Sequence, residues 1–275
     1  MLRLLVMIGL MPGLIAAATL EERMAEARSS FRRGNRERAV ELADLAVKEH
    51  PQDAGVWFFR GQIRVAMLDY DRAVTDFDHA VVLDPAHLFA WMERAAAHFR
   101  RGRLRQAIQD WDEVVRLEPG REPYLWQRGI AHYYAGQFEK GVKQFTIHQG
   151  VNSADVENAV FHFICNARAN SFDQARKELI PIAGDSRIPM MEIHRLFAGK
   201  ATEADVLATA AKGDGELRRR HEFYAHYYLG LYFEVAGDQA KTRRHIFAAE
   251  KLADAGGYMG DCARVHAELL RARGK

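Results

Sequence analysis

Residues 54–86 read AGVWFFRGQIRVAMLDYDRAVTDFDHAVVLDPA, and residues 88–120 read LFAWMERAAAHFRRGRLRQAIQDWDEVVRLEPG. The two segments carry large, small and proline residues at matching places, 34 residues apart. The first set is Trp57, Gly61, Tyr70, Ala73, Phe77, Ala80 and Pro85, and the second is Trp91, Ala95, Leu104, Ala107, Trp111, Val114 and Pro119. A constant period of this length is typical of a helical hairpin that is repeated and stacked along the chain.

The residue types at these positions have clear steric roles in such hairpins. Gly61 and Ala95 are small enough to let the two helices of one hairpin approach closely. Trp57 is large enough to fill the space between neighbouring hairpins. Pro85 and Pro119 have no backbone N–H, so they end their helices and force a turn into the next unit.

The order of Trp, Gly, then Ala-x3-Phe-x2-Ala, then Pro resembles the tetratricopeptide repeat. The resemblance implies an all-α fold, a right-handed superhelix or α-solenoid of helical hairpins, which serves as a scaffold for binding. We expect repeats 1–4 over residues 19–152 and a degenerate repeat with irregular helices over 153–215. A final hairpin with a C-terminal capping helix is expected over 216–275.

The second half of the chain departs from the strict repeat. The segment from Pro181 to Pro189 reads as a loop, and two short helices follow it. Thr202 and Asp205 have the spacing of a helix-capping pair for the second of these helices. The terminal helix is expected over 258–273, with one apolar side and one side in water.

The first eighteen residues have the pattern of a secretory signal peptide. A basic start is followed by an apolar run and by Ala16-Ala17-Ala18, which favours cleavage after Ala18. The sequence therefore predicts an exported protein, periplasmic or secreted, with no stable membrane anchor once the signal is removed. An uncleaved N-terminal anchor remains the alternative. No cysteine follows the apolar run, so a bacterial lipid anchor on cysteine is excluded.

Composition sets limits on the class of protein. The 275 residues are 48% hydrophobic and carry a formal charge of only +2, with no strongly basic face that would predict nucleic-acid binding. Cys165 and Cys262 both lie on apolar stripes, where buried free thiols are the usual state. Export would permit a disulfide between these two cysteines, which is the alternative. We expect no metal and no cofactor.

The inner face of such a solenoid is lined by the first helix of each repeat. In the family, fixed positions of that helix face inward, and their register here gives an aromatic groove. The candidate partner-binding residues are Phe58, Met92, Phe99, Arg100, Trp126, Ile130, Tyr133 and Tyr134. Tyr, Trp and Met are enriched at interfaces, so a protein or peptide partner is expected. The alternatives are that a later part of the chain, or a second copy in a homodimer, fills this groove.

A histidine pair and two basic runs are further candidates for a functional site. His221 and His226 lie five residues apart and so do not share a helix face as zinc ligands four apart would. The basic runs 100–105 and 218–220 are either solvated turns or docking patches for an acidic partner. No nucleophile, base and orienting group can be named, so an enzyme with a site in 181–215 is the least favoured hypothesis.

The overall arrangement is similar to bacterial envelope tetratricopeptide proteins of the NlpI type. The similarity covers the architecture and the four repeats, but not the lipid-bearing cysteine, which is absent. It implies a homodimeric, non-catalytic adaptor with partners among envelope enzymes, bringing peptidoglycan hydrolases to a protease or synthase. A structural, self-associating envelope protein is the alternative.

Overall fold

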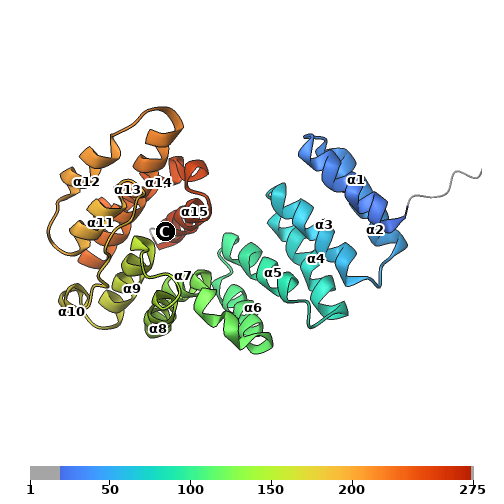
Figure 1. Cartoon of the computed structure of the whole chain (residues 1–275), viewed down its shortest axis with the longest axis horizontal. Helices are drawn as coiled ribbons and strands as arrows, with labels where there is room; N and C mark the ends of the chain where they lie inside the picture. The colour runs from blue at the N-terminus through green and yellow to red at the C-terminus, as the bar shows by residue number, and fades with distance from the viewer. Residues whose placement is uncertain (1–18, 274–275) are drawn as a thin grey trace, which may run out of the picture.

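The computed structural model describes residues 19–273, and every regular element in them is helical. The hairpins follow one another along a curved row that begins at α1, and the helices after α9 turn back beside it (Figure 1). The elements are α1 (Leu20–Arg32), α2 (Arg36–Glu49), α3 (Ala54–Ala66), α4 (Tyr70–Leu83), α5 (Leu88–Arg100), α6 (Leu104–Leu117), η1 (Pro119–Tyr124), α7 (Trp126–Tyr134), α8 (Phe138–Gln149), α9 (Val156–Ala169), α10 (Phe172–Lys177), α11 (Met190–Phe197), α12 (Glu203–Ala210), α13 (Gly215–Ala236), α14 (Gln239–Lys251), η2 (Ala253–Gly256) and α15 (Tyr258–Arg273). The all-α solenoid predicted from the sequence is confirmed.

The close approach predicted within each hairpin is present. A Cβ atom added at Gly61 would lie 2.5 Å from the ring of Phe77, which is fully buried sixteen residues later on α4. The same relation holds at Gly129, where an added Cβ would lie 2.7 Å from the ring of Phe145. The glycines are therefore required by packing, because each aromatic ring lies directly on the opposing backbone.

The tryptophans also tie consecutive hairpins together. Trp57 donates its indole N–H to the backbone carbonyl of Pro51 at 2.9 Å, and Trp91 does the same to Pro85 at 3.0 Å. Each ring therefore fills space and satisfies a carbonyl in the turn that leads into its own repeat. Leu125 stands in the corresponding place of repeat four, where the short η1 precedes a shorter first helix.

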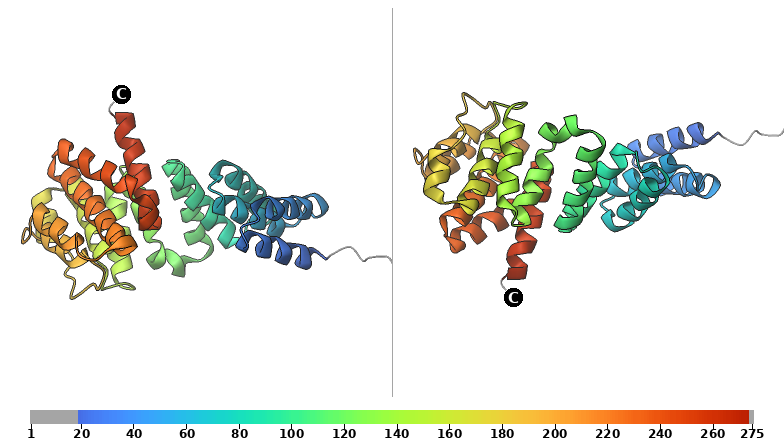
Figure 2. Two further views of the ribbon diagram at one scale, coloured as in Figure 1. Left: turned by 90° about the horizontal axis from the view of Figure 1, so that it is seen from above. Right: turned by 90° about the horizontal axis from the view of Figure 1, so that it is seen from below.

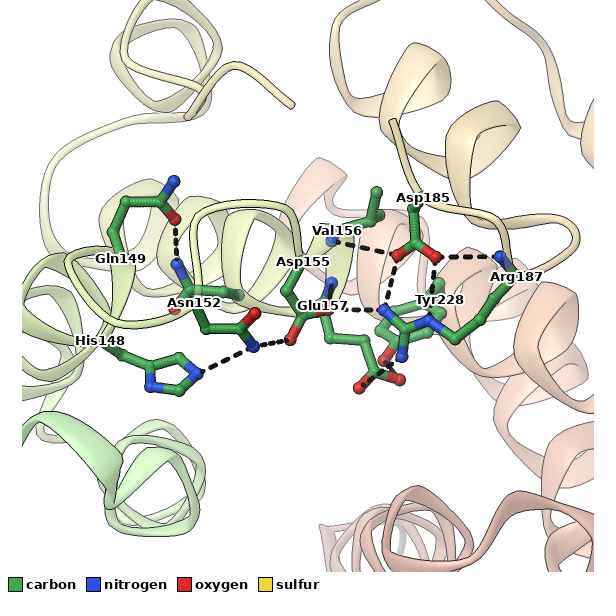
Figure 3. A network of polar contacts seen from close by, with 10 residues as sticks. His148, Gln149, Asn152, Asp155, Val156, Glu157, Asp185, Arg187 and Tyr228 are labelled. Carbon is green, nitrogen blue, oxygen red and sulfur yellow. Dashed lines mark hydrogen bonds and ion pairs between the residues drawn. The ribbon is translucent and has the colours of Figure 1, made fainter. Parts of the chain in front are cut away.

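The irregular middle of the chain is held by a cluster of charged residues. Figure 3 shows the guanidinium of Arg187 among three carboxylates. Arg187 lies 2.6 Å from Asp155, 2.6 Å from Asp185 and 3.2 Å from Glu157, measured between nitrogen and oxygen atoms. Tyr228 of α13 donates its hydroxyl to Glu157 at 2.8 Å. The cluster thereby fixes the loop before α11 against the start of α9 and against α13.

The two short helices that follow are confirmed as α11 and α12. Thr202 and Asp205 form the predicted capping box at the start of α12, in which each side chain pairs with the other's backbone N–H. The final hairpin is α13 and α14, and α13 has 22 residues. No described helix is both long and apolar enough to cross a membrane.

Helix α15 begins and ends where the sequence predicts, but its environment differs from that of an outer cap. It lies on the inner side of the curve, beside α14 and close to α5 and α7 (Figures 1 and 2). Residues from more than one side of the helix are buried, among them Met259, Cys262, Val265, His266 and Leu270. The helix is therefore a core element packed against the concave surface.

Both cysteines are buried free thiols, as the apolar stripes predicted. Cys165 of α9 faces α8, since a Cβ added at Gly141 would lie 2.5 Å from its sulfur. Cys262 of α15 is next to Tyr134, which lies 3.5 Å from the Cys262 carbonyl oxygen. The disulfide that the sequence left open is not formed.

Candidate functional site: the concave groove

The predicted groove is divided into a filled part and an open part. Phe99 and Ile130 are fully buried, Tyr133 is 4% exposed and Tyr134 is 9% exposed. The expectation that these four side chains are open to a partner is therefore wrong for the folded chain. The alternative, in which a later segment of the same chain packs into the groove, holds for this part of it.

Helix α15 fills the groove through its first turn. Tyr258 stacks on Phe99 with ring centroids 5.6 Å apart, and meets Trp126 edge-on at 4.9 Å. Arg100 pairs with Asp261 at 2.8 Å between Nε and the carboxylate oxygen. Three of the residues predicted to bind a partner thus bind the chain's own C-terminal helix, through the aromatic and ionic contacts expected of an interface.

Deeper in the filled part, two tyrosines make buried hydrogen bonds. The hydroxyls of Tyr134 and Tyr227 lie 2.9 Å apart, and Tyr133 donates to Glu234 at 2.5 Å. Burial alone would raise the pKa of Glu234, but His266, the Tyr133 hydroxyl and Arg168 outweigh it and lower the pKa to about 2. These contacts are structural, because they join α7, α13 and α15 to one another.

The other predicted groove residues, Phe58, Met92 and Trp126, are partly exposed. Phe58 lies against Phe77 and His87, with ring centroids 5.9 and 4.7 Å apart. Met92 and Trp126 pack on the main core. Whether these side chains also contact a partner stays a prediction.

The open part lies between the first helices of repeats one and two. It is a groove of about 280 Å³, lined by Arg28, Phe31, Arg32, Phe59, Gln62, Ile63 and Ala66. Arg28 lies over the ring of Phe59, 4.8 Å from its centroid. Among residues 19–273, no carboxylate lies within ion-pair distance of Arg28 or Arg32. The open groove therefore combines an aromatic floor with two uncompensated cations.

None of these groove residues, Arg28, Phe31 and Arg32 among them, is one of the partner-binding residues predicted from the sequence. The register that gives Phe58, Met92 and Trp126 also places these three residues at inward positions of repeat one. Repeat one lacks the large Trp of the later repeats, and none of its inward residues is among the predicted partner-binding residues. The signal was present in the sequence at the same spacing.

The basic runs and the histidine pair have partners within the chain. Arg101 and Arg103 both pair with Asp71 of the preceding repeat, at 3.1 and 2.6 Å. Arg219 pairs with Asp254 at 2.9 Å. His221 lies 2.8 Å from the carbonyl oxygen of Lys212 through Nδ1. These contacts show that arginines of both basic runs form ion pairs within the chain.

Comparison with known proteins agrees with this architecture. The family model of the tetratricopeptide repeat matches residues 24–66 and 60–122. No curated protein matches the chain in sequence. The likeness to envelope proteins of the NlpI type rests on the sequence pattern alone.

Solved structures extend the comparison to the whole fold. A tetratricopeptide repeat protein from Parabacteroides merdae is similar with a TM-score of 0.60 and 15% identity, over 92% of this chain and 98% of that one. MamA from Desulfovibrio magneticus is similar with a TM-score of 0.52 and 21% identity, over 57% of this chain and 89% of that one. At these identities the likeness concerns the fold. Residues 24–122 of the chain therefore carry tetratricopeptide repeats, and the chain as a whole shares the helical solenoid fold of a solved tetratricopeptide repeat protein.

Proposed function

We propose that the chain is a non-catalytic scaffold that binds an acidic segment of a partner protein in the open part of its concave groove. The observation that carries this proposal is the pair Arg28 and Arg32, which flank the aromatic floor and have no carboxylate partner among residues 19–273. A guanidinium pairs with a carboxylate through two parallel hydrogen bonds, and its planar face packs on aromatic rings.

The partner segment must supply acidic and apolar side chains together. The groove floor is formed by Phe31 and Phe59, and Gln62 offers an amide that can pair with a peptide backbone. A carboxylate two to four residues from an apolar anchor satisfies both requirements. Arginine and aromatic residues are the types that most often carry the binding energy of an interface.

The test is capture of partners from a bacterial envelope extract by the chain from Thr19 onward. The Arg28→Glu/Arg32→Glu variant is expected to lose at least about tenfold in affinity for the captured protein, or ~1.4 kcal/mol. Arg105→Glu/Arg220→Glu changes the charge equally at exposed positions outside the groove and serves as the matched control. Equal capture by both variants would contradict the proposal that the partner binds in the open groove. A dimer measured by light scattering, with no captured partner, would favour self-association.

We also propose that the protein is exported and acts in the periplasm or outside the cell. Support comes from the signal-like residues before Ala18 and from Thr19, whose side chain caps α1 together with Glu22. A chain cleaved after Ala18 would keep this cap. Intact mass and N-terminal sequencing of the protein from a periplasmic fraction should give a chain that begins at Thr19, whereas an uncleaved chain would identify an anchor.

A further inference from the structure

An ion-pair ladder runs along the first repeats with the same 34-residue period as the hairpins. Arg60 pairs with Asp44 at 2.8 Å and with Asp76 at 2.7 Å. Arg94 repeats this arrangement with Asp78 at 2.7 Å and Asp110 at 2.6 Å. Each arginine therefore joins a carboxylate of the previous repeat to a carboxylate within its own hairpin.

We call each of these arginines with its two carboxylates one rung of the ladder. Each rung contains a second basic residue, one turn after the arginine. In repeat two Arg64 lies 2.8 Å from Asp76. In repeat three His98 takes this position, with Nε2 4.0 Å from Asp110. Asp76 and Asp110 are 0% and 4% exposed, so these rungs are interior features.

Repeat four has the basic residues of the rung but lacks its inner carboxylate. Arg128 and His132 occupy the two basic positions, and Arg128 pairs with Asp112 of the previous repeat at 2.7 Å. Gln144 stands where the register places a carboxylate in the other two repeats, and it accepts from Arg128 at 2.8 Å. A neutral amide has replaced the acid.

A cavity of about 160 Å³ lies at this place, lined by Glu122, Arg128, His132, Lys140, Lys143 and Gln144. Neither lysine has an ion pair with a residue in the described range 19–273. The lining cations Arg128, Lys140 and Lys143 give +3 and Glu122 gives −1, which leaves +2. Counting Asp112 on Arg128 still leaves a positive site.

His132 gives an independent indication of a missing partner. The residue is 1% exposed, and its Nε2 has no hydrogen-bond partner in the described chain. Its Nδ1 lies 3.1 Å from the side-chain oxygen of Gln137. A buried polar atom without a partner costs about 1–3 kcal/mol. Once the ring is protonated, Nε2 donates a hydrogen bond, and a carboxylate can then satisfy it.

We propose that this cavity binds a carboxylate supplied by an acidic side chain of a partner protein, which completes the fourth rung as Asp76 and Asp110 complete the second and third. Lys140 and Lys143 attract the carboxylate, and Arg128 and His132 lie where the other rungs hold theirs. The site is separate from the open concave groove, and it does not depend on Arg28 or Arg32.

The proposal couples binding to proton uptake by His132. Burial, with Arg128 and Lys140 nearby and only partly offset by Asp112, lowers the pKa of His132 to about 4, so the free ring is neutral at pH 7. The charged groups around the cavity are Asp112 of α6, Glu122 of η1, Arg128 of α7, and Lys140 and Lys143 of α8. A carboxylate at Nε2 favours the protonated ring and raises the pKa of His132, so affinity should rise as pH falls from about 6 towards 4.

The test follows the histidine ring signals by NMR in the chain from Thr19, with a blocked tri-aspartate peptide as the probe and inorganic phosphate as a second arm. The His132 signals should shift on addition of the peptide, and the pKa of His132 should rise by about one unit or more. His98, whose rung already holds Asp110, is the internal control and should not move. Phosphate binding without peptide binding would overturn the proposal in favour of a free-anion site.

Two variants make the result decisive. Lys140→Gln/Lys143→Gln alters two exposed side chains and should weaken the peptide at least about fivefold without unfolding the chain. Gln144→Asp restores the carboxylate of the other rungs, so it should raise the pKa of His132 without any probe and abolish peptide binding. Arg28→Glu/Arg32→Glu should leave this binding unchanged. No shift of the His132 signals at pH 4–6, or an unaltered affinity in both cavity variants, would overturn the proposal.

Discussion

Tyr258 of α15 stacks on Phe99 of α5, with ring centroids 5.6 Å apart and ring planes inclined by 17°. The two residues are far apart in the chain, so their contact closes the concave surface between repeat three and the C-terminus. Removing the ring by Tyr258→Ala should destabilise the chain by about 3 kcal/mol, because a large aromatic contact is lost from the core. Urea unfolding followed by far-UV circular dichroism measures this.

Tyr124→Ala is the control, since Tyr124 is 62% exposed and its truncation should change the free energy of unfolding by less than about 0.5 kcal/mol. If Tyr258→Ala were as stable as this control, α15 would not be a core element. The groove next to Phe99 would then be open to a partner after all.

The bounds of α15 were predictable but its neighbours were not. The stripe of Cys262, Val265 and Leu269 fixes a helix and its apolar side. Periodicity states that one face must be covered, but not which element covers it, because the pairing of distant helices depends on the curvature of the whole solenoid. The same limit explains why Tyr133 and Tyr134 were expected in an open groove.

The spacing of the ladder arginines can be predicted from the sequence, but the residues that they contact cannot. Arg60, Arg94 and Arg128 recur every 34 residues, and this spacing can be read directly. Their partners lie sixteen residues before and after, a separation set by the hairpin geometry. Asp76, Asp110 and Gln144 also recur every 34 residues, but only the packed hairpins show that these positions contact the arginines.

Gly61→Leu tests the closest packing in the repeats. The new side chain would meet the buried ring of Phe77 from a Cβ only 2.5 Å away, so the two helices of the hairpin must separate. We expect a loss of about 3 kcal/mol, at the upper end of overpacking effects. Gly120→Leu is the matched control, because nothing lies within 4 Å of its Cβ position. Equal stability of the two variants by chemical denaturation would show that the hairpin register is wrong.

The ladder should contribute measurable coupling between its members. In a double-mutant cycle of Arg94→Ala and Asp110→Ala, we expect a coupling energy of about 1–3 kcal/mol, since both side chains are shielded from water. The exposed pair Arg116 and Glu113 should give less than about 0.5 kcal/mol in the same experiment. Coupling of the same size in both cycles would mean that the ladder is no stronger than a surface ion pair.

Glu234 should make stability depend on pH in the acid range. The pKa of Glu234 in the folded chain is about 2, below the ordinary glutamate value of 4.5, because His266, the Tyr133 hydroxyl and Arg168 outweigh the effect of burial. A lowered carboxylate pKa gives stability that is full above the unfolded pKa and is lost as pH falls towards the folded pKa. The difference of about 2.5 units corresponds to about 3 kcal/mol.

The check is the free energy of unfolding of the wild type minus that of Glu234→Gln, measured by urea denaturation from pH 7 to pH 2.5. This difference should be constant above pH 5 and should shrink by about 2–3 kcal/mol as pH falls to 2.5. Glu139→Gln removes the same charge at an exposed position of α8 and should show no such change. If the two variants gave parallel curves, the Tyr133 hydroxyl, His266 and Arg168 would not hold the carboxylate in its charged form. The junction of α7, α13 and α15 would then owe its stability to apolar packing and to the hydrogen bond between Tyr134 and Tyr227.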